Sequence, residues 1–159
     1  MKTLIILLAS LTMSPAAFAL DGQQFARAHE VWTEIKQTSA RAFYADLYLK
    51  EGNISQVCFV LGAMVSEVDA AGGNLEVLRL APVSKGISDS ILADIRKTQV
   101  AVTDLQSLAV STVGGCGGGG YRWSTKEVLS KQQLSERLQK ISSTAQAMAD
   151  AFESVVYSH

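Results

Sequence analysis

The stretch Gly114-Gly115-Cys116-Gly117-Gly118-Gly119-Gly120-Tyr121-Arg122-Trp123 decides how this chain is organised. It holds six of the 12 glycines and one of the two cysteines in the 159-residue sequence. Glycine is about 1 kcal/mol less favourable than alanine in a helix interior, so such a run ends a helix and starts a connector. The sequence before it has the pattern of several helices, and the sequence after it has the pattern of one long helix.

Apolar residues on both sides of this stretch recur at alternating steps of three and four, as on one face of an α-helix. The helix before it should begin at Ser88-Asp89, with a seam of Ile91, Ile95, Thr98, Val102, Leu105, Ala109 and Thr112. The helix after it should begin at a capping box, Ser124-Thr125-Lys126-Glu127. Its seam comprises Leu134, Leu138, Ile141, Ala145, Met148, Phe152 and Val155.

Two more helices are predicted nearer the N-terminus. The first should be capped by Asp21 with Gln24 and end at residues 51–53. Its expected apolar stripe is Phe25, Ala28, Trp32, Ile35, Ser39, Ala42, Phe43 and Leu47. The second should be capped by Asn53 with Gln56 and stop at Gly72-Gly73. Its stretch 54–68 is almost wholly apolar or small, which predicts the most buried helix.

Residues 74–86 are expected to form a short helical turn or an extended connector before Pro82 rather than a lone strand. With this segment as a link, the four helices predict an all-α fold, an antiparallel up-down four-helix bundle. A long two-stranded coiled coil is the alternative. It would leave the second helix with uncovered apolar surface.

The N-terminus has the pattern of a secretory signal peptide. Lys2 supplies a positive charge, residues 4–11 are apolar, and Ala17-Phe18-Ala19 fits a cleavage site. Residues 1–19 are therefore interpreted as the signal and residues 20–159 as one helical domain, periplasmic or secreted, with an uncleaved anchor as the alternative. Loss of Lys2 leaves one basic residue fewer than the original 14, against 15 acidic residues, so the net charge becomes −2. This balance gives no support to nucleic acid or an anionic membrane as partner, and no later stretch predicts a membrane span.

Cys58 and Cys116 are expected to form a disulfide. In an up-down bundle the start of the second helix and the end of the third lie at the same end. An exported protein with two cysteines usually has them paired. Two free thiols in a reducing compartment are the alternative, and they require the signal peptide interpretation to be wrong.

No catalytic, metal or cofactor motif stands out. His29 lacks a second histidine four residues later, where Thr33 stands, so a zinc helix is not indicated. No Cys-x-x-Cys-His motif supports an attached haem, and Met64 and Met148 are interpreted as core residues. Paired carboxylates such as Glu30 and Glu34 are interpreted as solvated charge. An enzyme is therefore disfavoured, and no cofactor or metal is expected.

The Gly-rich stretch is the candidate site. Gly117, Gly118, Gly119 and Gly120 allow close backbone approach, and Tyr121, Arg122 and Trp123 are residue types that often anchor protein interfaces. The stretch is alternatively a plain connector, with Trp123 packed back on the bundle; a phosphate cradle lacks the required spacing and preceding strand.

The sequence therefore favours an exported protein-binding module, most concretely an inhibitor or immunity-type protein that blocks a toxin or envelope hydrolase through a disulfide-tethered loop. Its partner would be another protein, and a homo-oligomer is possible. A structural or assembly subunit of an envelope or secretion apparatus is the first alternative. The second is a small-ligand carrier that uses the bundle interior.

Overall fold

The computed structural model describes residues 20–80, 87–116 and 128–157 of the chain. These residues form four helices, α1 (Gly22–Lys50), α2 (Ile54–Leu80), α3 (Asp89–Gly114) and α4 (Lys131–Val156), and no strand. The predicted all-α class with four helices is confirmed.

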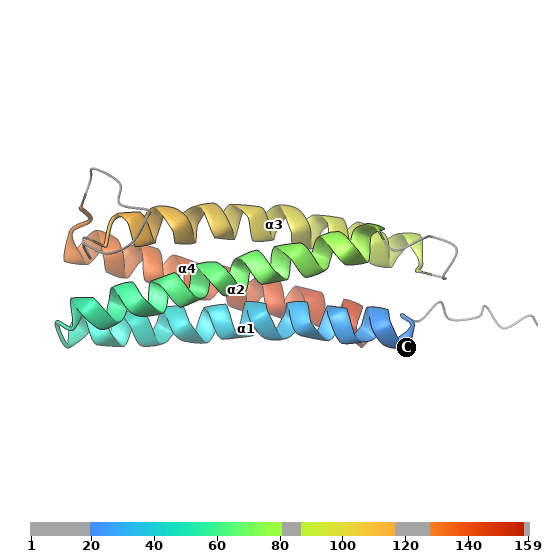
Figure 1. Cartoon of the computed structure of the whole chain (residues 1–159), viewed down its shortest axis with the longest axis horizontal. Coiled ribbons are helices and arrows are strands. Elements are labelled where there is room, and N and C mark those ends of the chain that lie inside the picture. Colours follow the sequence, from blue (N-terminus) through green and yellow to red (C-terminus); the bar gives the residue numbers. More distant parts are fainter. Residues whose placement is uncertain (1–19, 81–86, 117–127, 158–159) are drawn as a thin grey trace, which may run out of the picture.

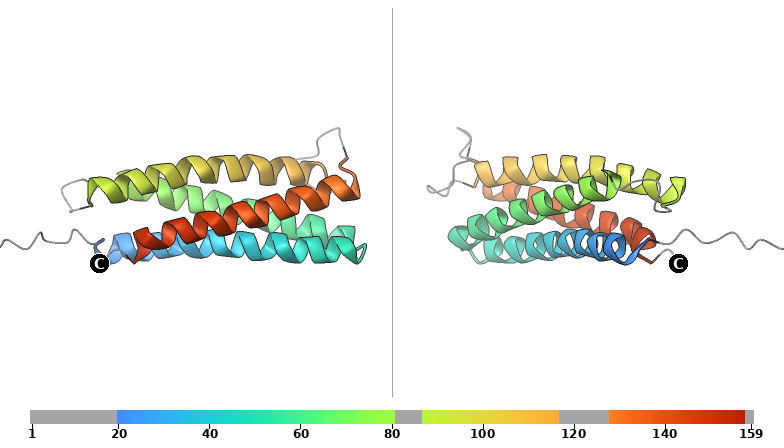
Figure 2. Two further views of the ribbon diagram at one scale, coloured as in Figure 1. Left: turned by 180° about the vertical axis from the view of Figure 1, so that it is seen from behind. Right: turned by 45° about the vertical axis from the view of Figure 1, so that its right-hand side comes forward.

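Each helix lies beside the next one along the chain, and α4 returns to α1. Contacts join α1 with α2, α2 with α3, α3 with α4, and α1 with α4. Figure 1 shows sequential helices running in opposite directions, and the two turned views of Figure 2 show the same arrangement. Hydrogen bonds between α1 and α4 agree with these directions, since they join Ser39 to Ser142 and Asp46 to Ser135. The residue numbers of the partners rise along α1 and fall along α4, as in an antiparallel pair of helices.

The core is a set of four heptad-like seams. The predicted α3 and α4 seams are confirmed in full, because every residue of both is buried. On α2 the buried seam is Val57, Leu61, Met64, Val68, Ala71, Leu75 and Leu78. On α1 it is Ala28, Val31, Ile35, Thr38, Ala42, Ala45 and Leu49. Leu20 packs partly buried against this core.

The predicted apolar stripe of α1 is partly wrong. Phe25, Phe43 and Leu47 are exposed, and Trp32 is only partly buried, whereas Val31, Ala45 and Leu49 enter the core. The buried face is therefore displaced from the largest apolar residues to smaller neighbours. Small side chains there allow α1 to lie close to both α2 and α4.

The prediction that α2 is the most buried helix is also wrong. Phe59 on its outer surface is 63% exposed, and Ile54, Val77 and Leu80 are exposed as well. By length and composition α2 could cross a membrane, since its most apolar 18-residue window has a mean hydropathy of 1.4, and 39% of that window is buried in the fold. Core helices of soluble proteins pass the same test, so one such helix is weak evidence for a membrane span.

The expected break at Gly72-Gly73 is absent, and residues 74–80 are helical rather than a connector. Leu75 and Leu78 continue the α2 seam and are almost fully buried, and each such leucine stabilises the fold by roughly 2 kcal/mol. That gain offsets the cost of two helical glycines, about 1 kcal/mol each. A Cβ atom at Gly72 would lie 3.7 Å from Val102 of α3, an ordinary van der Waals contact, so packing against α3 does not require glycine there.

Helix α4 begins later than predicted. Residues 128–130 are not helical, and Ser130 is the N-cap, in a capping box with Gln133. The predicted box at Ser124–Glu127 lies outside the described residues. Ser130 and Gln133 satisfy the same rule closer to the seam, which explains the later start. The other caps are as predicted: Asp21 with Gln24 on α1, Asn53 with Gln56 on α2, and Ser88 on α3.

Candidate functional site at the disulfide end

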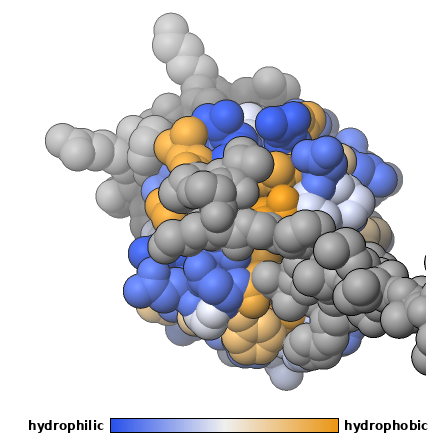
Figure 3. All heavy atoms as spheres, turned by 90° about the vertical axis from the view of Figure 1, so that its right-hand side faces the viewer, coloured by the Kyte–Doolittle hydropathy of each residue, from blue (hydrophilic) through white to orange (hydrophobic). Residues whose placement is uncertain are grey.

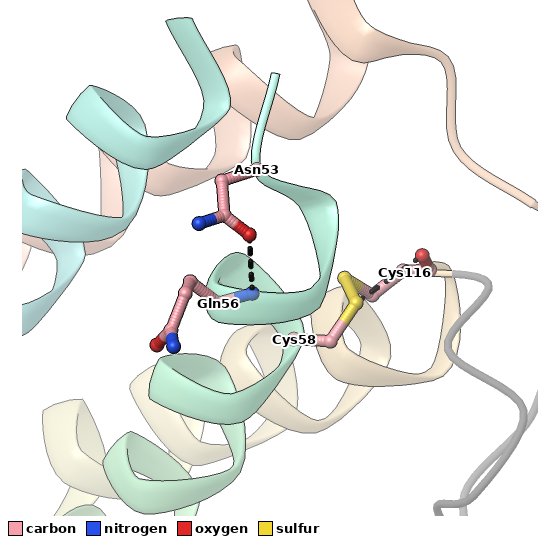
Figure 4. The surroundings of a disulfide bond; sticks show 4 residues. All are labelled: Asn53, Gln56, Cys58 and Cys116. Carbon is pink, nitrogen blue, oxygen red and sulfur yellow. Dashed lines mark hydrogen bonds between the residues drawn. A yellow bond between two sulfur atoms is a disulfide. The ribbon is translucent and has the colours of Figure 1, made fainter. Parts of the chain in front are cut away.

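A disulfide joins α2 and α3 at one end of the bundle, as predicted. Cys58 lies near the start of α2 and Cys116 directly follows α3, with 5.8 Å between their Cα atoms. Both residues are buried. Close by, the Asn53 side chain caps α2 by accepting a hydrogen bond from the Gln56 amide at 3.3 Å (Figure 4). The disulfide therefore fixes the C-terminal end of α3 against a capped helix start.

A second constraint lies next to the disulfide. The backbone amide of Leu129 donates to the carbonyl of Gly115 at 2.8 Å, and the Leu129 side chain packs directly on Gly115. A Cβ atom at residue 115 would lie 2.7 Å from Leu129 Cδ1 and nearer still to Cγ, so only glycine fits without movement. The chain segment that follows α3 and the segment that precedes α4 are therefore held next to each other, by the disulfide at Cys116 and by the contact of Leu129 with Gly115.

Exposed apolar side chains occur at this same end. Phe59 follows Cys58 on α2, Ile54 begins α2, and Val128 precedes Leu129, the residue that packs on Gly115. Ile54 is 40% exposed and Val128 is 69% exposed. Large apolar groups in water favour association with another surface. The base of the Gly-rich stretch is therefore rigid and partly apolar.

The remaining predicted site residues, Gly117 to Gly120 with Tyr121, Arg122 and Trp123, lie outside the described residues. The sequence analysis missed Ile54, Phe59, Val128, Leu129 and the steric role of Gly115. Apolar residues occupy every face of α2, and Cys58 and Val60, which also lie between seam positions 57 and 61, are buried, so no periodicity marks Phe59 as exposed. Nothing in the sequence pairs Gly115 with Leu129, because that contact depends on the path between α3 and α4.

The opposite end of the bundle has a different character. There the rings of Phe25, His29, Trp32 and Tyr157 form a continuous group, with centroids of successive rings 5.5 to 6.1 Å apart. Figure 3 views this end and shows hydrophobic atoms between hydrophilic ones. His29 is exposed among aromatic side chains, consistent with its interpretation as a non-ligand. In the described residues, no group of three or more His, Cys, Asp or Glu side chains could hold a metal ion.

Three hydroxyl groups of the core are engaged within the fold. Thr98 donates to the carbonyl of Asp94 at 2.8 Å, and Thr112 donates to that of Leu108 at 2.6 Å. Ser39 donates to the Ser142 carbonyl on α4 at 3.0 Å. The hydroxyls that a ligand in the interior would use therefore already have backbone partners, and Met64 and Met148 are buried core residues as expected.

Two carboxylates lie partly buried between α1 and α2. Glu67 pairs with Arg41 at 2.5 Å through Oε1, while its buried Oε2 has no hydrogen-bond partner among the described residues. Burial raises the pKa of Glu67, and Arg41 only partly opposes this. Burial also raises the pKa of Glu34, and the negative charges of Glu30 and Glu67 raise it further. A hydrogen bond from Asn74 acts in the opposite direction but does not cancel the increase. Glu34 is thus part of a helix interface rather than a fully solvated face.

Asp46 shows the opposite behaviour at the α1–α4 interface. Burial acts to raise its pKa, but hydrogen bonds from Ser135, Lys50 and Gln139 outweigh burial and hold the pKa below its usual value. Asp46 is therefore a structural anion whose partners are all within the bundle.

No protein-family model matches the chain, and no significant match was found among curated proteins or solved structures. The function is therefore inferred from the residues of this chain alone.

Proposed function

We propose that the chain is an exported protein-binding module that engages its partner with the disulfide end of an antiparallel helical bundle. The observation that carries this proposal is the doubly fixed base of the Gly-rich stretch. Cys58–Cys116 holds one side of it, and the Leu129–Gly115 hydrogen bond holds the other. A plain connector between two helices needs neither constraint.

A fixed base favours binding because it limits the conformational entropy lost when a loop is ordered against a partner. The exposed Phe59 and Val128 beside it supply apolar area, and Tyr121, Arg122 and Trp123 supply the residue types that most often carry interface energy. In the most concrete form of the proposal, these residues enter a cleft on a toxin or envelope hydrolase and inhibit it. The module itself is assigned no catalysis and no cofactor.

Export is part of the same proposal. Residues 1–19 would direct secretion and be removed, leaving Leu20 as the first residue. The disulfide is compatible with an oxidising compartment such as the periplasm or the extracellular space.

Affinity capture from periplasmic extract tests the proposal. The wild-type chain should retain a specific protein, which mass spectrometry then identifies. Arg122→Ala, Trp123→Ala and Phe59→Ser should each reduce that capture at least tenfold while leaving helicity unchanged. Val100→Ser is the matched control, because Val100 is 65% exposed on the middle of α3, away from this end.

Equal capture by all four variants would defeat the binding role of this end. Retention of several membrane proteins in one large complex would favour the assembly-subunit alternative instead. Inhibition is a separate step, and it is tested by adding the purified chain to the captured protein and measuring the activity of that protein.

A further inference from the structure

A second surface is formed by the outer sides of α1 and α4, on a different side of the bundle from the α2–α3 pair that the disulfide joins. An open groove of about 630 Å³ runs between these helices. Small residues lie along it, namely Ser39 and Ala40 on α1 and Ser142 and Ser143 on α4. The described chain leaves this groove open.

An apolar ridge borders the groove. Phe43 and Tyr44 line one wall and pack edge to face, with ring centroids 5.8 Å apart, and Leu47 follows one turn later on α1. These residues are 57%, 56% and 37% exposed. A ridge beside a groove on one face is self-complementary, because a two-fold axis places the ridge of each copy in the groove of the other.

The available area matches a weak but specific dimer. With roughly 200 Å² on each large side chain, Phe43, Tyr44 and Leu47 leave roughly 300 Å² exposed per copy. Covering them in both copies removes roughly 600 Å² from water, and the facing groove surfaces bring the total toward the roughly 1,200 Å² of the smallest standard interfaces. That value is at the lower limit of standard interfaces, so we expect a dissociation constant in the micromolar range.

The charges of the groove favour one orientation. Lys36 lines the end of the groove away from the ridge, and its ammonium already lies 4.3 Å from the centroid of the Trp32 ring. Asp46 lines the end that carries Phe43 and Tyr44. Antiparallel copies place each Lys36 near the exposed rings of Phe43 and Tyr44 of the other copy, where an aromatic face attracts an ammonium, while Asp46 stays paired with Lys50 within its own bundle. Parallel copies would place Lys36 against Lys36.

We propose that the groove between α1 and α4 binds a second copy of this chain, forming an antiparallel two-fold dimer through Phe43 and Tyr44. The two disulfide ends then point in opposite directions and stay accessible. The dimer is therefore independent of the partner-binding role proposed above.

Sedimentation velocity on the purified chain, without reductant, tests the dimer. From about 1 µM to about 100 µM the weight-average mass should rise toward twice that of one chain. The double variant Phe43→Ser/Tyr44→Ser should weaken association at least tenfold, and Lys36→Glu should weaken it through charge. Val100→Ser is the control, since it removes an exposed apolar side chain from α3, outside both proposed surfaces, and should associate as the wild type does.

Circular dichroism establishes that each variant is folded before its mass is interpreted. A wild-type chain that stays monomeric up to about 100 µM would overturn the proposal. So would equal weakening by Val100→Ser, or a mass that grows beyond two chains, which indicates open-ended association. Capture of an external partner bears on the disulfide end alone, because Phe43→Ser/Tyr44→Ser should leave that capture intact.

Discussion

Ser39 on α1 and Ser142 on α4 exchange hydrogen bonds across the helix interface. The Ser39 hydroxyl donates to the Ser142 carbonyl at 3.0 Å, and the Ser142 hydroxyl donates to the Ser39 carbonyl at 3.1 Å. A side chain this short can reach a carbonyl on the neighbouring helix only if the two backbones lie close together. The pair therefore sets the spacing of α1 and α4 and gives the groove above it a floor of small residues.

Two substitutions of Ser142 should destabilise the fold for different reasons. Ser142→Ala removes one donor, and we expect a loss of about 1 kcal/mol in the free energy of unfolding. Ser142→Leu also forces the helices apart. Overpacking of this kind typically costs about 1–3 kcal/mol, so the loss should be at least as large as that of Ser142→Ala. Urea denaturation measures both. Ser143→Ala is the control, since the Ser143 hydroxyl donates only to Lys140 within α4; an equal loss there would contradict the role of the pair.

Gly115 should be sensitive to substitution in a way that Gly73 is not. An alanine at residue 115 collides with Leu129, so Gly115→Ala should lower the free energy of unfolding by about 1–3 kcal/mol. A Cβ at Gly73 meets nothing within 4 Å inside helix α2. Gly73→Ala should therefore stabilise the protein, by up to about 1 kcal/mol. Thermal melts of both variants decide the point, and a destabilised Gly73→Ala would refute the helical path of α2 at that position.

The disulfide should contribute strongly to stability. It closes a loop with a sequence separation of 58 residues, so the double variant Cys58→Ala/Cys116→Ala should lose about 4 kcal/mol if the chain-entropy model applies. Because both cysteines are buried, reductant should act slowly on the folded protein and quickly in moderate urea. Alkylation followed by mass spectrometry measures this difference. Fast reduction of the native protein would show that the disulfide end opens easily.

The sequence predicts α3 and α4 well because each has only one apolar face. Every residue of the expected seams is buried, and the caps at Asp21, Asn53 and Ser88 follow from local hydrogen bonding alone. The disulfide follows from helix order. These features need only local information and the up-down connection of the helices.

The errors fall where local information is ambiguous. On α1 the large residues Phe25 and Phe43 suggest the core, yet the alternating steps of three and four continue from Ala42 to Ala45 and Leu49, which are the residues that are buried. On α2 apolar residues occupy every face, so no period separates buried Leu61 from exposed Phe59. The continuation of α2 beyond Gly73 depends on the burial of Leu75 and Leu78 against other helices. The sequence pattern of one helix taken alone does not contain the free energy of that burial.

Leu75 provides a direct test of that extension. It is fully buried in a segment for which the sequence predicts no regular helix. Leu75→Ala should lower the free energy of unfolding by about 2–5 kcal/mol, as expected for a leucine removed from a packed core. Val77→Ala is the neighbouring control, since Val77 is exposed on the same helix. Similar small effects at both positions would mean that residues 74–80 do not pack on the bundle.

The raised pKa values of Glu67 and Glu34 predict an unusual pH dependence of stability. A carboxyl whose pKa is higher in the folded protein takes up its proton on folding as the pH falls, so protonation favours the folded state. The contribution of these two groups to the free energy of unfolding should therefore rise as the pH falls from neutral to 4.5, the ordinary pKa of a glutamate side chain. Below about pH 4 this gain is complete, and Asp46, whose pKa is lowered, then makes the fold less stable as it is protonated.

Glu67→Gln isolates the contribution of Glu67. Glutamine keeps the shape and can still accept a hydrogen bond from Arg41, but it removes the ionised carboxylate whose Oε2 is buried without a partner in the described part of the chain. The variant should therefore gain less stability than the wild type between pH 7 and pH 5, measured by urea denaturation at each pH. Glu136→Gln changes the charge by the same amount at an exposed position of α4 and serves as the control. If Glu67→Gln instead becomes more pH-dependent than the wild type, the Arg41 ion pair outweighs burial, and the sign assigned to Glu67 is wrong.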